Sequence, residues 1–184
     1  GGTSVGSVES LTNVKKIVEN INEPVVVVVS ALGGITDRLI RTSQLAVAGD
    51  DNYRNEFDAM VDRHHGIIDA VIPAGAAHDT LKAKVDALLD ELRSIYHGVY
   101  LIRDMTQKTA NVIVSYGERM SSQIVSAFIE GSQCYDSREF IKTVRKQNRN
   151  LVDFDVTIRL VIQTFARMPR IAVVPGFIAS DAND

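Results

Sequence analysis

The sequence lacks the features of a secreted or membrane protein. Its single cysteine, Cys134, excludes a disulfide within the chain. No stretch reaches the roughly 20 apolar residues of a membrane-spanning helix, and none has the charged, apolar and small-residue order of a signal peptide. We therefore expect a cytoplasmic protein without a membrane partner.

The chain also lacks an excess of charge of one sign. Its 20 basic and 23 acidic residues give a net charge of -3, and the basic residues are scattered along the sequence. Nucleic acids and anionic lipids need a concentrated basic surface, so neither is an expected partner. With 184 residues, 45% of them hydrophobic, the chain can bury the core of one domain. Chemistry on small molecules becomes the favoured class of function.

Two apolar segments predict strands of a mainly parallel sheet. Residues 25–29 are five consecutive valines, which favour a fully buried strand, and residues 171–174 predict a second one. Apolar residues at helical spacing over residues 8–21 precede the first strand, and another helical pattern follows the turn at residues 31–36. This alternation predicts an α/β domain built in layers.

The middle of the chain is predicted to be mostly helical. The apolar spacing indicates a long helical excursion over residues 50–103 and a further helix over residues 109–130. A short strand is expected at residues 134–136, and a solvated hairpin at residues 140–152, where basic residues separate two apolar patches. Residues 156–168 predict one more helix.

A glycine-rich turn at the start of the chain is a candidate for anion binding. Gly-Gly-Thr-Ser-Val-Gly at residues 1–6 leads into a helix N-terminus, where free backbone N–H groups and the helix dipole favour a phosphate. The glycine spacing excludes the dinucleotide-binding fingerprint, and the Gly-Lys-Ser/Thr of a Walker loop is missing. Glycine-rich turns also occur where they only close the chain, so both interpretations stay open.

A second turn at residues 30–36 has the same design. Ser30 ends the first strand, Gly33 and Gly34 allow close backbone approach, and Thr36 is placed as N-cap of the next helix. Ligands bind at the carboxyl ends of parallel strands, so we expect both turns at one edge of the sheet, suiting a phosphate donor beside a carboxylate acceptor. The alternative is that Thr36 only caps its helix.

Glu118 is a third candidate, near the middle of an otherwise apolar helix. Gly117 leaves room beside it for another backbone or a ligand. A carboxylate in this position requires a cation, which is either a ligand or, in the alternative interpretation, Arg119 or a distant lysine. Helical spacing places Glu118 in a polar stripe with Asn111, Ser115, Ser121 and Ser122.

The remaining candidates are weaker. His64 and His65 are adjacent, face different sides of a helix and have no second ligand one turn away, so we expect solvated surface and no metal site. Phe177 follows an apolar strand, and it either lines a site or packs.

Four blocks of the sequence together resemble successive motifs of aspartate kinases. They are residues 1–6, residues 28–37 (Val-Val-Ser-Ala-Leu-Gly-Gly-Ile-Thr-Asp), residues 115–122 (Ser-Tyr-Gly-Glu-Arg-Met-Ser-Ser) and residues 174–178 (Val-Pro-Gly-Phe-Ile). Their order and spacing match the family along the whole chain. The resemblance is closest to the kinase part of the bifunctional aspartokinase/homoserine dehydrogenase type.

The resemblance implies a fold and a reaction. The fold is the amino-acid kinase fold, an α/β/α sandwich with a mainly parallel sheet. The reaction transfers the γ-phosphoryl group of ATP, with magnesium, to the side-chain carboxylate of L-aspartate, giving 4-phospho-L-aspartate for lysine, methionine and threonine synthesis. The full-length enzyme is expected to be a homo-oligomer.

The resemblance also implies site residues, although it assigns no certain catalytic residue and no metal ligand. It places Gly2, Thr3 and Ser4 at the transferred phosphate. The residues that it places at aspartate are Ser30, Ala31, Thr36, Glu118, as the partner of the ammonium group, and Phe177.

The chemistry agrees with this assignment. A carboxylate nucleophile is already ionised at neutral pH, so phosphoryl transfer to it needs no general base. The site needs positive charge instead, because two anions must approach each other.

The sequence departs from the family at both ends. The family has Lys-Phe before the two glycines and a Gly-Arg-Gly-Gly-Ser-Asp-Tyr segment after the last block, and neither is present. We therefore expect residues 1–184 to be the N-terminal part of one catalytic domain, without the nucleotide-binding half or regulatory modules. Such a polypeptide should bind ATP poorly and not turn over.

Two alternatives remain at this point. One is a sister enzyme of the same fold that acts on acetylglutamate, glutamate or carbamate, against which the block around Glu118 argues. The other is a non-catalytic fragment that serves in folding or oligomerisation.

Overall fold

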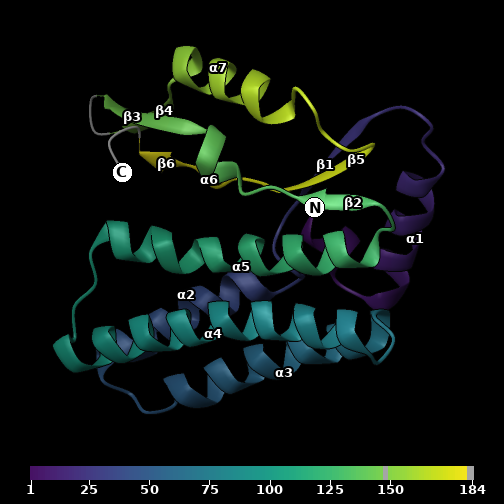
Figure 1. The fold of residues 1–184 in the computed structure, drawn as a ribbon. Coiled ribbons are helices and arrows are strands. Elements are labelled where there is room, and N and C mark those ends of the chain that lie inside the picture. The colour runs from purple at the N-terminus through teal and green to yellow at the C-terminus, as the bar shows by residue number, and fades with distance from the viewer. Residues whose placement is uncertain (147–148, 182–184) are drawn as a thin grey trace.

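The computed structural model describes residues 1–146 and 149–181, and a parallel sheet lies at its centre (Figure 1). Its strands β1 (Val25–Val29), β5 (Ile171–Pro175) and β2 (Ser132–Cys134) are ordered β1-β5-β2. Both neighbours pair with β5 in parallel, with Val25 and Ser132 each opposite Ile171. All five residues of β5 are buried, as predicted for that segment. The α/β fold with a mainly parallel sheet is confirmed.

The prediction of a fully buried strand over residues 25–29 is wrong. Val29 is buried, but the side chains of Val26 and Val28 are 44% and 63% exposed. The physical reason is position, because β1 is an edge strand of this sheet and alternate side chains of a strand point to opposite faces. Described elements cover only one of those faces over β1.

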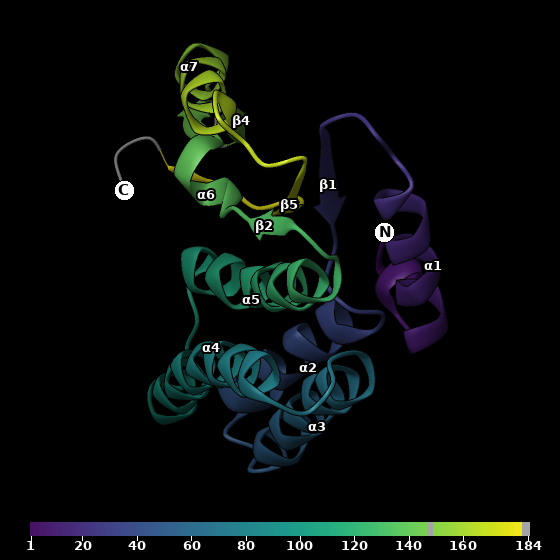
Figure 2. The same cartoon turned by 45° about the vertical axis from the view of Figure 1, so that its right-hand side comes forward.

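Helices fill the region beside the sheet (Figure 2). After a 3₁₀ turn, η1 (Gly2–Val5), the first helix is shorter than the predicted 8–21. The long helix α5 lies along one face of the sheet, and α2, α3 and α4 pack beneath it. The helices are α1 (Val8–Glu19), α2 (Ile35–Ala48), α3 (Tyr53–Val71), α4 (Ala76–Ile102) and α5 (Gln107–Phe128).

The helical excursion predicted over residues 50–103 is confirmed as the pair α3 and α4. The break between them contains Pro73 and ends at Gly75, whose φ of 148° favours glycine. Tyr96 of α4 is fully buried, stacks edge-to-face with Phe57 at 6.1 Å between ring centroids, and donates a hydrogen bond to the carbonyl of Leu39 at 2.9 Å. These contacts join α3 and α4 to α2.

The expectation that His64 is solvated is also wrong. Its side chain is completely buried in α3, where its Nδ1 pairs with the carbonyl of Met60 at 2.8 Å, while its Nε2 has no partner within the described residues. His65 does face away, and its Nε2 lies 2.6 Å from Asp86. His64 shares the buried stripe of α3 with Met60 and Ile67.

A second small sheet follows the strand β2, which lies two residues earlier than predicted. The strands β3 (Lys142–Lys146) and β4 (Arg149–Val152) pair antiparallel and confirm the predicted hairpin, whose residues 147–148 lie outside the described residues. The strand β6 (Ser180–Asp181) pairs in parallel with β3. The short helix α6 (Ser137–Phe140) precedes this sheet, and α7 (Phe154–Phe165) begins two residues before the predicted 156, with Asp153 as N-cap. Among the described residues, no helix is both long and apolar enough to cross a membrane.

Candidate active site

The two glycine-rich turns pack directly against each other. A Cβ atom added to Gly33 would lie 3.3 Å from the carbonyl oxygen of Gly2 and 3.3 Å from the Cα of Gly6, and one added to Gly2 would lie 3.3 Å from the carbonyl of Ala31. Side chains at these glycines would therefore force the turns apart. The prediction that both turns lie at the same edge of the sheet is confirmed.

The first turn is held by a hydrogen bond at one end, and two of its side chains are exposed. The guanidinium of Arg63 donates to the carbonyl of Gly6, and Ser7 caps α1 through a reciprocal pair of hydrogen bonds with Ser10. Thr3 and Ser4 therefore have no capping role, and both are exposed. Their hydroxyl groups remain available to a ligand at the turn.

The second turn differs from its prediction in one respect. The N-cap of α2 is Gly34, with a left-handed φ of 81°, and not Thr36. Thr36 lies one residue inside the helix, half-buried, and its hydroxyl makes no hydrogen bond in the part of the chain that the structure describes. Left-handed backbone at Gly34 turns the chain into α2 without a capping side chain.

Ser30 is fixed between the sheet and α5. The hydroxyl of Ser121 donates a 2.7 Å hydrogen bond to the carbonyl of Ser30, and the N–H of Gly176 donates to the carbonyl of Val29 at 2.7 Å. The carboxyl ends of β1 and β5 and the middle of α5 are thereby joined. Sequence reasoning placed Ser121 in the polar stripe but did not predict this link.

Glu118 is the one charged side chain of the polar stripe, and it is buried, with 7% of its surface exposed. Burial raises the pKa of its carboxyl, and a hydrogen bond from the backbone N–H of Ala31 opposes part of that change. Its Oε2 atom is buried without a partner among the described residues. Gly117 permits the close approach of Ala31 to α5, because a Cβ at residue 117 would lie only 2.7 Å from the Cβ of Ala31.

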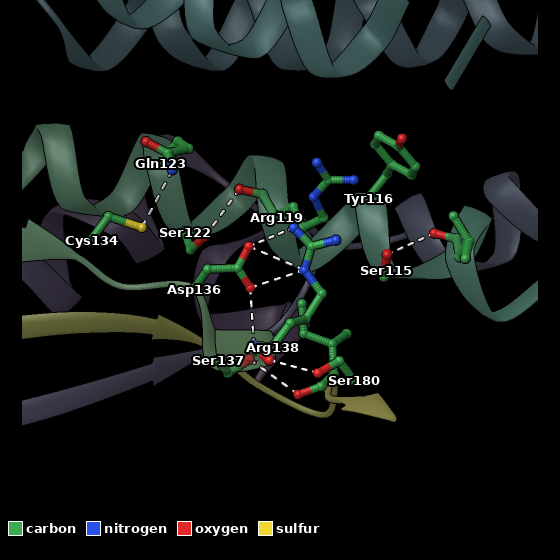
Figure 3. Close-up of polar contacts among 12 residues, drawn as sticks. Ser115, Tyr116, Arg119, Ser122, Gln123, Cys134, Asp136, Ser137, Arg138 and Ser180 are labelled. Atoms are coloured by element: carbon green, nitrogen blue, oxygen red, sulfur yellow. Dashed lines mark hydrogen bonds and ion pairs between the residues drawn. The ribbon is translucent and has the colours of Figure 1, made fainter. Parts of the chain in front are cut away.

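The alternative of a salt bridge between Glu118 and Arg119 is wrong. Arg119 pairs with Glu91 of α4 at 3.3 Å. Its guanidinium also lies over the ring of Tyr116, 4.2 Å from the ring centroid (Figure 3). Ser115 and Ser122 do not donate to the carboxylate of Glu118 either, since their hydroxyl groups donate to the backbone carbonyls of Val112 and Arg119. A buried carboxylate oxygen without a partner is costly, so this position suits a cationic ligand group.

Phe177 does not pack into the core. Its side chain is fully exposed, and its φ of 61° places a bulky residue in the left-handed region. Such a conformation costs on the order of 1 kcal/mol or more and is often found at functional sites. Because Gly176 pairs with β1, Phe177 lies at the same edge of the sheet as the two turns.

An open cleft of about 780 Å³ lies beside these residues, and none of the predicted site residues lines it. It runs between the first half of α5 and the small sheet, with Ser115 and Asn111 on the helix side. On a helix, residues 111, 115 and 118 share a face, so the cleft approaches Glu118 along α5. Sequence reasoning missed it, because three distant segments form its walls.

Comparison with known proteins gives a consistent picture. A family model described as the amino acid kinase family matches residues 1–184. The chain is 29% identical over 188 residues to bifunctional aspartokinase/homoserine dehydrogenase 1, chloroplastic, of Zea mays, and 30% identical over 189 residues to the corresponding bifunctional protein of Daucus carota. Each alignment covers 98% of this chain and 20% of the relative. The chain thus spans about a fifth of these relatives.

The fold is similar to that of a solved aspartokinase. The crystal structure of E. coli aspartokinase III in complex with aspartate and ADP superposes with a TM-score of 0.85 at 22% identity, over 100% of this chain and 40% of the other. The implied amino-acid kinase fold is confirmed. Since the family model matches residues 1–184, the whole of this chain, the chain belongs to the amino acid kinase family.

Proposed function

We propose that this chain supplies the aspartate pocket and one phosphate-binding turn of an aspartate kinase. The enzyme would transfer the γ-phosphoryl group of ATP to the side-chain carboxylate of L-aspartate, giving 4-phospho-L-aspartate. The observation that carries the proposal is Glu118, a buried carboxylate whose Oε2 has no partner in the described chain, next to the second glycine-rich turn. An α-ammonium group is the complement of that carboxylate.

In this proposal, different residues bind the cationic and the anionic groups of the substrates. Glu118 binds the ammonium group, Ser30, Ala31 and Thr36 contact the rest of aspartate, and Phe177 covers it from the end of β5. Gly2, Thr3 and Ser4 face the transferred phosphate. This arrangement needs no general base, because the nucleophilic carboxylate is already ionised, and its contribution is to position two anions and neutralise their charge.

Backbone donors support the phosphate role. The N–H groups of Gly33 and Gly34 donate to no acceptor within residues 1–146 and 149–181. They lie in the turn that packs against the first turn, and Gly34 begins α2, so they add to the positive end of that helix. An oxyanion between the turns would satisfy them.

ATP and magnesium are part of the proposal. The related E. coli aspartokinase III forms a complex with aspartate and ADP, which supports a nucleotide as the phosphoryl donor. Magnesium usually binds through substrate phosphates and one or two carboxylates. The described residues contain no group of three or more His, Cys, Asp or Glu side chains that could hold an ion, so we assign no metal ligand here and derive no step through the metal.

Other features of the enzyme stay predictions. The names of the bifunctional relatives support a place in the synthesis of amino acids derived from aspartate. Those relatives are named as chloroplastic proteins. The cytoplasmic location expected for this chain stays a prediction. Homo-oligomerisation of the full-length enzyme is likewise proposed from the resemblance alone.

Isothermal titration calorimetry of the chain tests the proposal. L-aspartate, succinate and N-acetyl-L-glutamate are compared, because the last two lack a free ammonium group. We expect the wild-type chain to prefer L-aspartate over succinate by about tenfold or more, since a charge-assisted hydrogen bond to a buried group contributes roughly 1.5–3 kcal/mol. Glu118→Gln should abolish that preference.

The control is Glu130→Gln, at an exposed position just beyond α5, which should leave the preference intact. Equal affinity of the wild-type chain for aspartate and succinate would refute the assigned role of Glu118. Tighter binding of N-acetyl-L-glutamate than of aspartate would favour the sister enzyme that acts on acetylglutamate.

A further inference from the structure

The open cleft contains a cation that its own neighbours do not neutralise. Lys142 of β3 is half-buried and lines the cleft. Its ammonium group donates to the hydroxyl of Ser180 at 2.6 Å and to the carbonyl of Arg138 at 3.0 Å, and both acceptors are neutral. No carboxylate lies within 4.0 Å of it in the described part of the chain. An ammonium group has three N–H donors, so one remains for a ligand.

The position of this ammonium group is fixed by its surroundings. Ser180 also donates to the carbonyl of Arg138 at 2.7 Å, and Thr143 donates to the carbonyl of Ser180 at 3.1 Å. The backbone N–H of Lys142 donates to the hydroxyl of Thr157 at 3.0 Å. These bonds tie β3, β6 and α7 together around Lys142. A ligand bound by Lys142 would therefore contact an ammonium group whose position is already fixed.

Arg138 differs from Lys142 because it has a carboxylate partner. Its Nε lies 3.0 Å and its Nη2 lies 2.5 Å from the oxygens of Asp136 (Figure 3). Among the described residues that line the cleft, the four basic side chains Lys108, Arg138, Lys142 and Arg145 outnumber the three acidic ones, Asp136, Glu139 and Asp181. The cleft therefore favours a ligand with negative charge, and Lys142 is its best-placed contact.

We propose that this cleft is a second binding site, separate from Glu118, that takes a small oxyanion on Lys142. The shared chemistry is a carboxylate or phosphate group, held by the ammonium of Lys142 and flanked by the side chains of Asn111 and Asn150. The two sites select opposite charges, since Glu118 needs a cation and Lys142 an anion. The inference rests on the cleft alone and stands whether or not the chain binds aspartate.

Nuclear magnetic resonance of the ¹⁵N-labelled chain tests this site. Inorganic phosphate and succinate are titrated separately, which distinguishes phosphate from carboxylate ligands. We expect saturable shifts of the backbone amides of Asn111, Thr143 and Ser180 with at least one of the two anions. Lys142→Met should weaken that binding about tenfold or more, because the charge-assisted hydrogen bond is lost.

Two variants serve as controls. Lys142→Arg keeps the charge and should retain binding, whereas Lys146→Met removes an exposed charge at the end of β3 outside the cleft and should change little. Should Lys142→Met not fold, the side-chain resonance of Lys142 in the wild-type chain gives the same answer, because a bound anion must shift it. The absence of saturable shifts with both anions, or equal binding by Lys142→Met, overturns the proposal.

An effect confined to one site separates this proposal from the aspartate pocket. Shifts limited to residues 30–34 and 117–118 would count against the cleft. Shifts limited to the cleft would support the cleft without counting against the aspartate pocket, because phosphate and succinate lack the ammonium group that Glu118 needs.

Discussion

Gly117 controls how closely α5 approaches the second glycine-rich turn. A Cβ at this position would meet the Cβ of Ala31 at 2.7 Å and a methyl of Leu39 at 3.3 Å, distances that require something to move. In an open helical position, the change from glycine to alanine would instead stabilise a helix by roughly 1 kcal/mol. The packing at Gly117 should reverse that sign.

We predict that Gly117→Ala destabilises the chain by about 1–3 kcal/mol and weakens aspartate binding, because it moves Ala31 away from Glu118. The matched control is Gly98→Ala in α4, where an added Cβ has open space and should stabilise the chain by up to about 1 kcal/mol. Urea denaturation measures both changes. A stabilised Gly117→Ala variant would show that the contact between α5 and the turn is looser than the structure has it.

At the scale of single residues, the sequence predicted the placement of Glu118 better than it predicted local backbone geometry. Glu118 was identifiable because a lone carboxylate stood on an otherwise apolar helix. The prediction of Thr36 as N-cap was wrong because Gly34 adopts a left-handed conformation and is itself the N-cap. The helix α2 therefore begins before Thr36. The exposure and backbone strain of Phe177 depend on the turn after β5, and no pattern in the sequence indicates them.

At the scale of elements, periodicity located most helices and strands within a few residues. His64 was misjudged because its polarity was weighed above its place in α3. The spacing of Phe57, Met60, His64 and Ile67 is that of a buried stripe, and this spacing could have indicated the outcome. For residues 25–29, composition predicted a strand but not its place at the sheet edge, which the pairing with β5 decides.

The buried position of His64 makes the stability of α3 depend on pH. Burial lowers the pKa of His64 to about 4, against 6.5 in an exposed chain. The folded state therefore keeps His64 neutral where the unfolded state takes up a proton. Stability from this residue is fully present above pH 6.5 and is lost progressively as the pH falls toward 4.

We predict that His64 alone lowers the free energy of unfolding by about 2 kcal/mol between about pH 7 and pH 5. His64→Leu should remove that part of the pH dependence, whereas His97→Gln, at an exposed position in α4, should keep it. Both variants retain the pair of His78 with Asp69, so its contribution cancels in the comparison. Parallel pH profiles for His64→Leu and the wild-type chain would contradict a buried neutral His64.

At the scale of the whole molecule, the parallel sheet collects the site from distant segments. The two turns, the middle of α5 and the end of β5 meet because β1 and β5 are neighbours and α5 crosses their face. The order of these motifs along the chain could be read from the sequence. The cleft at Lys142 could not, since its walls come from α5, α6, β3, β4 and β6, whose mutual placement only the folded chain reveals.

A crystal structure of the chain grown with L-aspartate tests directly whether Glu118 binds the substrate's ammonium group. We expect one aspartate with its ammonium nitrogen about 3 Å from Oε2 of Glu118 and its side-chain carboxylate directed toward the turn at residues 1–6. Aspartate bound only in the cleft at Lys142, or with a carboxylate toward Glu118, would contradict the assignment of Glu118 as the partner of the substrate's ammonium group.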